Sequence, residues 1–154
     1  MKRIEVKLNL PAVAPLLDAI KAAADSLADG LAAPLRLDDL DAEFAAAWQA
    51  ELVEAQNGDV RALLALFDRE FFSSGIVAFD ETNAEAVVRA CSALRLRLRA
   101  GPLAGQTDEE LESGAVEPER LEPPVARAFM AYVFLATLQD LILRHLDSTI
   151  LGSR

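Results

Sequence analysis

The longest apolar stretch of the chain lies close to its C-terminus. Every residue from Ala128 to Ala136 is apolar, and a helix that is apolar on all sides is normally buried in a core. This pattern predicts a long central helix, roughly Val125 to Leu146, with the other helices packed around it. Charged and polar residues flank the run, which is shorter than the roughly 18 residues that a membrane span needs. We therefore predict a buried helix and no membrane partner.

Two short stretches have the pattern of strands. Ile4, Val6 and Leu8 alternate with charged residues, which is the period-2 pattern of a strand with one buried face. The run Ile76–Phe79 is apolar and is bounded by turn and acidic residues, which indicates a second strand. Because an isolated pair of strands is marginally stable, we expect the two to form a ribbon with helices on one face.

Apolar residues at helical spacing predict three helices in the N-terminal half. The first begins at two prolines, which are tolerated in a first turn but not further in, and it ends at Gly30. After a connector over residues 31–37, Asp38 or Asp39 can cap a second helix. The stripe of this second helix that we expect to face the core is Leu40, Phe44, Ala47, Trp48 and Leu52.

The second helix is predicted to stop at Gln56-Asn57-Gly58. Asp59 is then placed to cap a third helix, which ends at Ser73-Ser74-Gly75. The residues that this third helix turns inward are Val60, Leu63, Leu64, Phe67 and Phe71.

A fourth helix is predicted over residues 83–99. Thr82 and Glu85 have the spacing of a capping box, in which a hydroxyl and a carboxylate satisfy free amides at a helix start. Thr107 and Glu110 repeat this spacing before a short helix in the acidic segment Asp108–Pro124, which leads into the C-terminal helix. The apolar stripe of the fourth helix is Val87, Cys91, Leu94 and Leu98.

Composition agrees with a helical fold. The chain has 154 residues, of which 53% are hydrophobic, and this length fits one domain over residues 1–154. Most of the hydrophobic residues are alanine and leucine, which are good helix formers. We predict a mainly α fold: a single-domain bundle of five or six helices around the buried C-terminal helix, with a small two-stranded β ribbon.

Charge and cysteine content limit the cellular compartments and the classes of partner that we expect. The net charge of −10 opposes non-specific attraction to nucleic acid, so no nucleic-acid partner is expected. The single cysteine, Cys91, excludes an internal disulfide and a thiolate metal cluster. The N-terminus alternates apolar and charged residues and lacks the apolar core of a secretory signal. These features predict a cytoplasmic protein.

No catalytic, cofactor or metal motif stands out along the chain. His145 is the single histidine, and no Glu-x-x-His pair of the kind that binds metal in helical bundles is present. The segment Gly101–Gly105 lacks the lysine and hydroxyl residue of a phosphate-binding loop. Cys91 lies on an apolar stripe, where a free cysteine behaves as a small hydrophobe. We expect no catalytic residue, no cofactor and no metal.

The most unusual local feature is a separation of charge around the fourth helix. Arg95, Arg97 and Arg99 lie in a stretch without acids, and helical spacing puts Arg95 and Arg99 on one face while Arg97 points elsewhere. Seven acids follow between Asp108 and Glu122. The simplest interpretation is that this acidic segment folds back onto the helix and forms solvated ion pairs. The alternative is an arginine pocket that grips a carboxylate or phosphate, with Tyr132 beside it.

Several short patterns along the chain occur together: Phe44 and Trp48, Leu63-Leu64 with Phe67, the run Asn83–Val88, the pair Arg95-Leu96, and Tyr132–Gln139. With these residues the chain resembles a bacterial domain-of-unknown-function family of small, mainly helical proteins. The resemblance spans most of the chain, and it implies no activity. Such proteins look like companions of protein-turnover adaptors, which would suit a non-catalytic binding role. The long acidic segment departs from the family pattern.

Three functional hypotheses remain open at this point. The first is a non-enzymatic interaction or adaptor-like protein that binds a protein partner through the surface of helix 83–99 and the acidic segment. The second is a small-anion-binding protein or enzyme that uses Arg95 and Arg99 beside Tyr132. The third is a structural homodimer, which needs no foreign partner.

Overall fold

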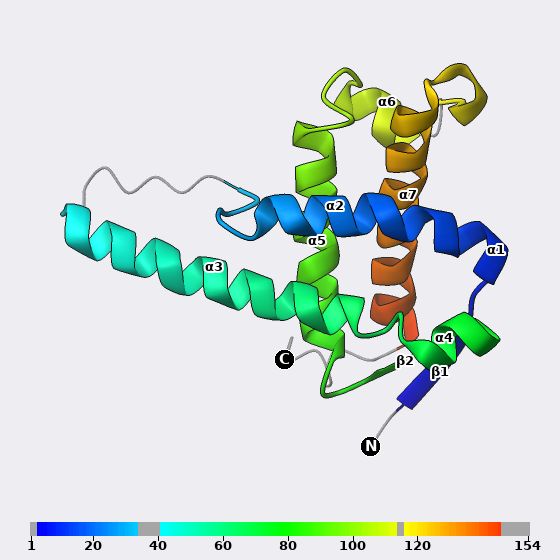
Figure 1. Ribbon diagram of the computed structural model, residues 1–154, viewed down its shortest axis with the longest axis horizontal. Helices are drawn as coiled ribbons and strands as arrows, with labels where there is room; N and C mark the ends of the chain where they lie inside the picture. Colours follow the sequence, from blue (N-terminus) through cyan, green and yellow to red (C-terminus); the bar gives the residue numbers. More distant parts are fainter. Residues whose placement is uncertain (1–2, 34–40, 114–115, 146–154) are drawn as a thin grey trace.

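The computed structural model describes residues 3–33, 41–113 and 116–145. Its two strands, β1 (Arg3–Lys7) and β2 (Ile76–Asp80), pair antiparallel with Ile4 opposite Phe79. Phe79 is fully buried, whereas the side chains of β1 alternate between exposed and half-buried positions. The predicted two-stranded ribbon is confirmed. It lies at the end of the molecule near the N-terminus (Figure 1), and β2 packs against α4.

The first predicted helix is present but divided. It consists of α1 (Leu10–Val13), a 3-10 turn η1 (Ala14–Leu16) and α2 (Leu17–Leu27). Asn9 caps α1 by accepting a hydrogen bond from the Ala12 amide, and a proline stands in the first turn of both α1 and η1. Because each proline lacks an N–H, the chain tightens between the two segments instead of running on as one α-helix.

The second and third predicted helices are wrong in their boundaries. A single helix, α3 (Ala42–Leu64), runs straight through Gln56-Asn57-Gly58. The polar pair Gln56 and Asn57 does not end its own helix because both side chains bond the end of α2 and the loop after it: Gln56 bonds the Leu27 and Gly30 carbonyls and the Ala32 amide. Asp41 caps α3, and the predicted caps Asp38 and Asp39 lie outside the described residues, as does part of the connector.

A separate short helix, α4 (Arg69–Ser74), replaces the end of the predicted third helix. Asp68 caps it by accepting from the Phe71 amide at 3.0 Å. Gly75 ends it in the left-handed conformation, with φ 78°, which glycine adopts without a steric penalty. The predicted cap Asp59 instead lies within α3 and forms an ion pair with Arg89 at 2.9 Å.

The fourth predicted helix is confirmed as α5 (Ala84–Ala100), and its apolar stripe is buried. Its capping box is wrong, because the Thr82 hydroxyl donates to Asp80 and no side chain caps the helix start. The second capping box is confirmed: Thr107 and Glu110 exchange hydrogen bonds at the start of α6 (Asp108–Ser113). A 3-10 turn, η2 (Pro118–Arg120), follows.

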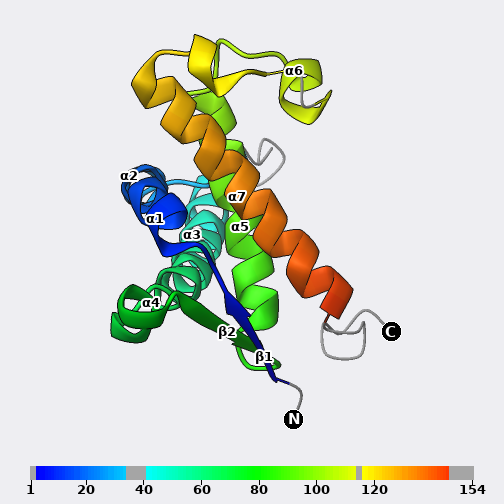
Figure 2. The ribbon, with the colours of Figure 1, turned by 90° about the vertical axis from the view of Figure 1, so that its right-hand side faces the viewer.

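The last helix, α7 (Pro123–His145), is long as predicted, but it is not buried on all sides. It packs against α5, α2 and η1, and Figure 2 shows α5 and α7 side by side. Met130, Val133 and Leu143 remain exposed, so one stripe of α7 faces solvent. The helix in the middle of the bundle is α5, since it contacts α2, α3 and α7.

By length and composition alone, α7 could also cross a membrane, and it is the one helix of the described residues that meets this test. A core helix of a soluble protein meets the same test. In this fold 44% of the most apolar 18-residue stretch of α7 is buried against the rest of the chain.

Candidate functional site

The predicted site residues Arg95 and Tyr132 meet in one network between α5 and α7. Arg95 Nη1 donates to Gln139 Oε1 at 2.9 Å, and Arg95 Nη2 donates to Tyr132 Oη at 3.2 Å. The guanidinium carbon also lies 4.7 Å from the centre of the Tyr132 ring, within the range of a cation–π contact. Gln139 in turn donates to the Val88 carbonyl at 2.9 Å. These contacts connect α5 to α7.

The acidic segment folds back onto this network, as the sequence predicts. Glu112 on α6 accepts a hydrogen bond from the Tyr132 hydroxyl at 2.9 Å and lies 3.8 Å from Arg95. Arg99, one turn further along α5, pairs with Asp108. Both predicted arginines of this face therefore already have carboxylate partners from their own chain.

A shallow depression of about 270 Å³ lies over these residues and is lined by Ser92, Arg95, Leu96, Arg99 and Tyr132. Any anion that entered it would have to displace Asp108 or Glu112 from the two guanidinium groups. The geometry therefore does not favour an anion pocket at Arg95 and Arg99 over a structural role for the two residues.

Arg97 is separated from this face, as its helical position predicts. It lies at a different pocket, between α2, α5 and α7, together with Arg127. Its Nε atom is buried and has no acceptor. Three arginines that are two residues apart in sequence thus have different surroundings, and Arg97 is the one without a carboxylate partner among the described residues.

The groups with reactive side chains do not form a catalytic arrangement in the described residues. Burial raises the pKa of the Cys91 thiol to about 12, so the thiol stays protonated and unreactive at neutral pH. The hydrogen bond to Asp59 raises the pKa of Arg89, so the Arg89 guanidinium stays protonated. Within residues 3–33, 41–113 and 116–145, no three His, Cys, Asp or Glu side chains are grouped to hold a metal.

The sequence interpretation missed an exposed pair of aromatic residues on the first half of α3. We call residues 42–53 the α3 arm, because this part of the helix extends beyond the body of the protein (Figure 1). Phe44 and Trp48, predicted to face the core, are 56% and 43% exposed. Their rings contact each other, with centroids 6.2 Å apart. They lie one helical turn apart on one side of the arm.

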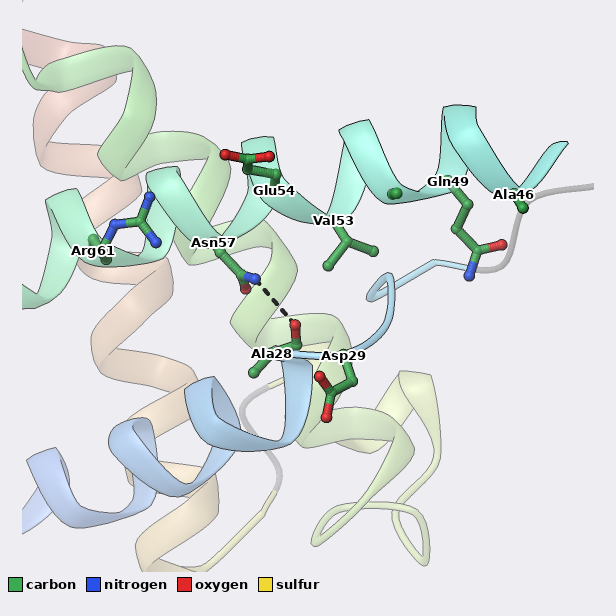
Figure 3. A pocket seen from close by; sticks show the side chains of 9 residues that line it. Ala28, Asp29, Ala46, Gln49, Val53, Glu54, Asn57 and Arg61 are labelled. Atoms are coloured by element: carbon green, nitrogen blue, oxygen red, sulfur yellow. Dashed lines mark hydrogen bonds between the residues drawn. The ribbon is translucent and has the colours of Figure 1, made fainter. Parts of the chain in front are cut away.

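The opposite side of the arm opens onto a cleft of about 540 Å³ (Figure 3). Asn57 donates to the Ala28 carbonyl at 3.0 Å, where α2 ends. Val53 faces the loop after α2, and Gln49 and Ala46 lie still further along the helix. Contact between α3 and α2 therefore stops near Asn57, and the arm continues past it.

One sequence signal could have identified the arm. From Asp41 to Gly58 the chain has four acids, Asp41, Glu43, Glu51 and Glu54, and no lysine or arginine. A core helix of this length usually carries both signs of charge on its outer face. The apolar stripe alone is ambiguous, because the same spacing describes a core face and a docking face.

Together the fold and the site define a small, mainly helical protein whose predicted arginine cluster is largely engaged in contacts within the chain. Residues 8–146 match the model of a family described as a domain of unknown function (DUF2017), and the chain belongs to this family. The predicted membership of a domain-of-unknown-function family is thus confirmed. No curated protein and no solved structure matched the chain in the other two comparisons.

Proposed function

We propose that the protein is a non-enzymatic interaction protein that docks a partner protein on the α3 arm. The observation that carries this proposal is the exposed aromatic pair Phe44 and Trp48 on a helix end that packs against little else of the described chain. Tryptophan and phenylalanine remove large apolar areas from water when they are covered, and tryptophan is among the residues that contribute most to protein interfaces.

The charge of the arm indicates the chemistry of the partner. The arm carries Glu43 and Glu51, is flanked by Asp41 and Glu54, and has no lysine or arginine. It therefore attracts a segment that carries lysine or arginine beside its apolar residues. The best match is a basic amphipathic helix that lays its apolar face along Phe44 and Trp48. A second copy of the same arm fits less well, because it would bring two acidic helices together.

The arm is a better docking surface than the α5 face. Arg95 and Arg99 would have to exchange their internal partners Glu112 and Asp108 for those of another protein, whereas the aromatic rings of the arm need only lose water. A charge reversal at Arg95 is also a poor test of docking, because it would place a carboxylate beside Glu112 and break the contacts between α5 and α7. The location of this role in the cytoplasm remains a prediction from composition.

The test is affinity capture from the native host with three forms of the protein. These are the wild type, the double variant Phe44→Ser with Trp48→Ser, and the control variant Leu143→Ser. Leu143 is an exposed residue of α7, with 57% of its surface accessible, so its substitution makes a comparable change of polarity away from the arm. We expect one partner to be captured by the wild type and the control, and to be lost from the double variant.

A photo-cross-linking residue at Ala47, between the two aromatic residues, then identifies the partner segment. Mass spectrometry of the cross-linked peptide should show a basic segment with apolar residues at helical spacing. Equal capture by the double variant would overturn the assignment of the arm, and an acidic cross-linked segment would overturn the proposed partner chemistry.

Trp48 is the single tryptophan of the chain, so its fluorescence reports directly on the arm. For the protein alone, we expect emission typical of solvent-exposed indole that does not change with protein concentration. A shift to shorter wavelength and a doubled mass by light scattering at high concentration would mean that a second copy covers the arm, which contradicts docking of a foreign partner.

A further inference from the structure

A second surface feature lies away from the α3 arm, where α2 crosses α5 and α7 (Figure 1). A slot of about 500 Å³ opens there between α2, the C-terminal end of α5 and the first turns of α7. This volume is within the range of small-molecule sites. Its apolar lining is provided by Ala19, Ala22, Ala23, Leu98, Pro102 and Ala128. The slot is open because the side chains that α2 presents to it are small.

The positive charges at this slot are only partly balanced within the described residues. Arg97 and Arg127 both line it, and neither side chain forms an ion pair or hydrogen bond with any described residue. Arg97 is half-buried, and its Nε–H is a buried donor without an acceptor, which is an unfavourable state for a guanidinium group. Asp18 and Ser26 are the other polar residues of the lining, and Asp18 offsets one of the two positive charges.

The start of α7 adds to the positive potential. Pro124 and Arg127 belong to the first turns of this 23-residue helix, and the N-terminal end of a helix carries a partial positive charge. Pro123 and Pro124 have no amide hydrogen to donate, so this helix end can attract an anion but offers few backbone hydrogen bonds to it. The hydrogen bonds to a bound anion must come from the arginines.

We propose that this slot binds a small monocarboxylate with an apolar tail. The carboxylate binds the guanidinium group of Arg97, which can hold two carboxylate oxygens side by side, and Arg127 adds a second positive charge at the rim. The apolar tail lies along Ala19, Ala22 and Leu98. The slot is a different surface from the α3 arm, and this site does not depend on a protein partner.

Octanoate is the probe, titrated into the purified protein by isothermal calorimetry. We expect saturable binding of one molecule per chain. Each methylene removed from water tightens binding about fourfold, so hexanoate should bind roughly tenfold or more weakly than octanoate. Octanol has the same tail and no charge, and it should bind at least about tenfold more weakly, because a hydrogen bond to a charged group is lost.

Three variants locate the site. Arg97→Gln keeps a polar side chain but loses the charge, and it should weaken octanoate binding at least about tenfold. Ala22→Phe fills the slot from an exposed position of α2 and should weaken binding without altering any charge. Arg69→Gln is the matched control: Arg69 is an exposed arginine on α4 that makes no ion pair in the described residues, and its loss should leave binding unchanged.

The proposal is overturned if octanoate does not bind at concentrations up to about 5 mM, which is about five times the dissociation constant of roughly 1 mM that a site of this kind should reach. Equal binding by Arg97→Gln and Arg69→Gln would also overturn it, since the carboxylate would then lie elsewhere. Octanol binding as tightly as octanoate would show an apolar site without carboxylate recognition, and this too contradicts the proposal. Circular dichroism of each variant confirms that it is folded before titration.

Discussion

Replacing Arg95 by methionine should destabilise the protein, because Arg95 holds α5 and α7 together. The substitution keeps an unbranched side chain of similar length but removes hydrogen bonds to Gln139 and Tyr132 and the cation–π contact with the Tyr132 ring. It leaves Gln139 Oε1 without its donor in a part-buried position.

The magnitude follows from these contacts. The two hydrogen bonds from a charged donor and the ring contact together contribute about 3 kcal/mol, allowing for the 26% exposure of the Arg95 side chain. Arg95 Nε is buried without an acceptor, so removing it returns about 1 kcal/mol. The net loss of unfolding free energy is about 2 kcal/mol, which corresponds to roughly 4–8 °C in Tm for a chain of this length.

The assay is urea unfolding followed by circular dichroism, with Arg99→Met as the matched control. Arg99 pairs with Asp108, whose side chain is 83% exposed, and an ion pair of this kind contributes less than about 1 kcal/mol. Tyr132→Phe should fall between the two variants, because it loses the hydroxyl contacts and keeps the ring. If Arg95→Met and Arg99→Met cost the same, Arg95 does not connect the two helices and the reasoning is refuted.

Three further predictions concern the core and the chain connections. Burial raises the pKa of the Cys91 thiol from 9.0 to about 12, so the folded state keeps a proton that the unfolded chain loses as pH rises above 9.0. From about pH 8 to about pH 10 the unfolding free energy of the wild type should therefore fall by about 1.4 kcal/mol more than that of Cys91→Ala. Urea unfolding measures both, and equal losses would contradict the shift. Gly75→Ala should lower the unfolding free energy by at least about 2 kcal/mol in the same assay, because the residue has φ 78° and an added Cβ would lie 2.7 Å from the Leu8 carbonyl oxygen. A loss below about 0.5 kcal/mol would show that this turn adapts to the added Cβ. Gln56→Leu should lower the stability measured by thermal unfolding by about 2 kcal/mol, because it removes three hydrogen bonds to the end of α2 and the following loop. The control Gln49→Leu, at an exposed position of the same helix, should be nearly neutral. Equal effects of the two substitutions would refute the role of Gln56 in holding α3 to α2.

Local signals in the sequence predicted the elements whose patterns are unambiguous. The alternation in Ile4–Leu8, the buried stripe of α5 and the Thr107 capping box each follow from residues close together in the chain, and each is present. The predicted helix boundary at Gln56-Asn57-Gly58 was wrong because the Gln56 and Asn57 side chains bond a segment that is more than twenty residues away in sequence. Polar residues that serve another helix look the same in sequence as residues that end their own helix.

The burial of apolar stripes was the second point that sequence could not decide. The stripes that contain Val87 and Trp48 both have helical spacing, yet Val87 is fully buried and Trp48 is 43% exposed. The difference depends on where the neighbouring helix stops, since α2 reaches α3 only as far as Asn57. Helix spacing defines an apolar face, but the lengths of the elements around it determine whether that face is covered.

The same reasoning explains why the arginine cluster was a weaker guide to function than it looked. Nothing in the sequence distinguishes Arg95, Arg97 and Arg99 from one another as partners for a carboxylate. In the structure α6 folds over one face of α5 and supplies Glu112 to Arg95 and Asp108 to Arg99. Arg97 faces α2, whose small residues leave the slot open and whose Asp18 lines the slot without forming an ion pair with Arg97. An arginine is informative about ligands when its own chain leaves it unpaired beside open apolar space. By that criterion Arg97, and not Arg95 or Arg99, is the residue of this helix where an external anion should be sought.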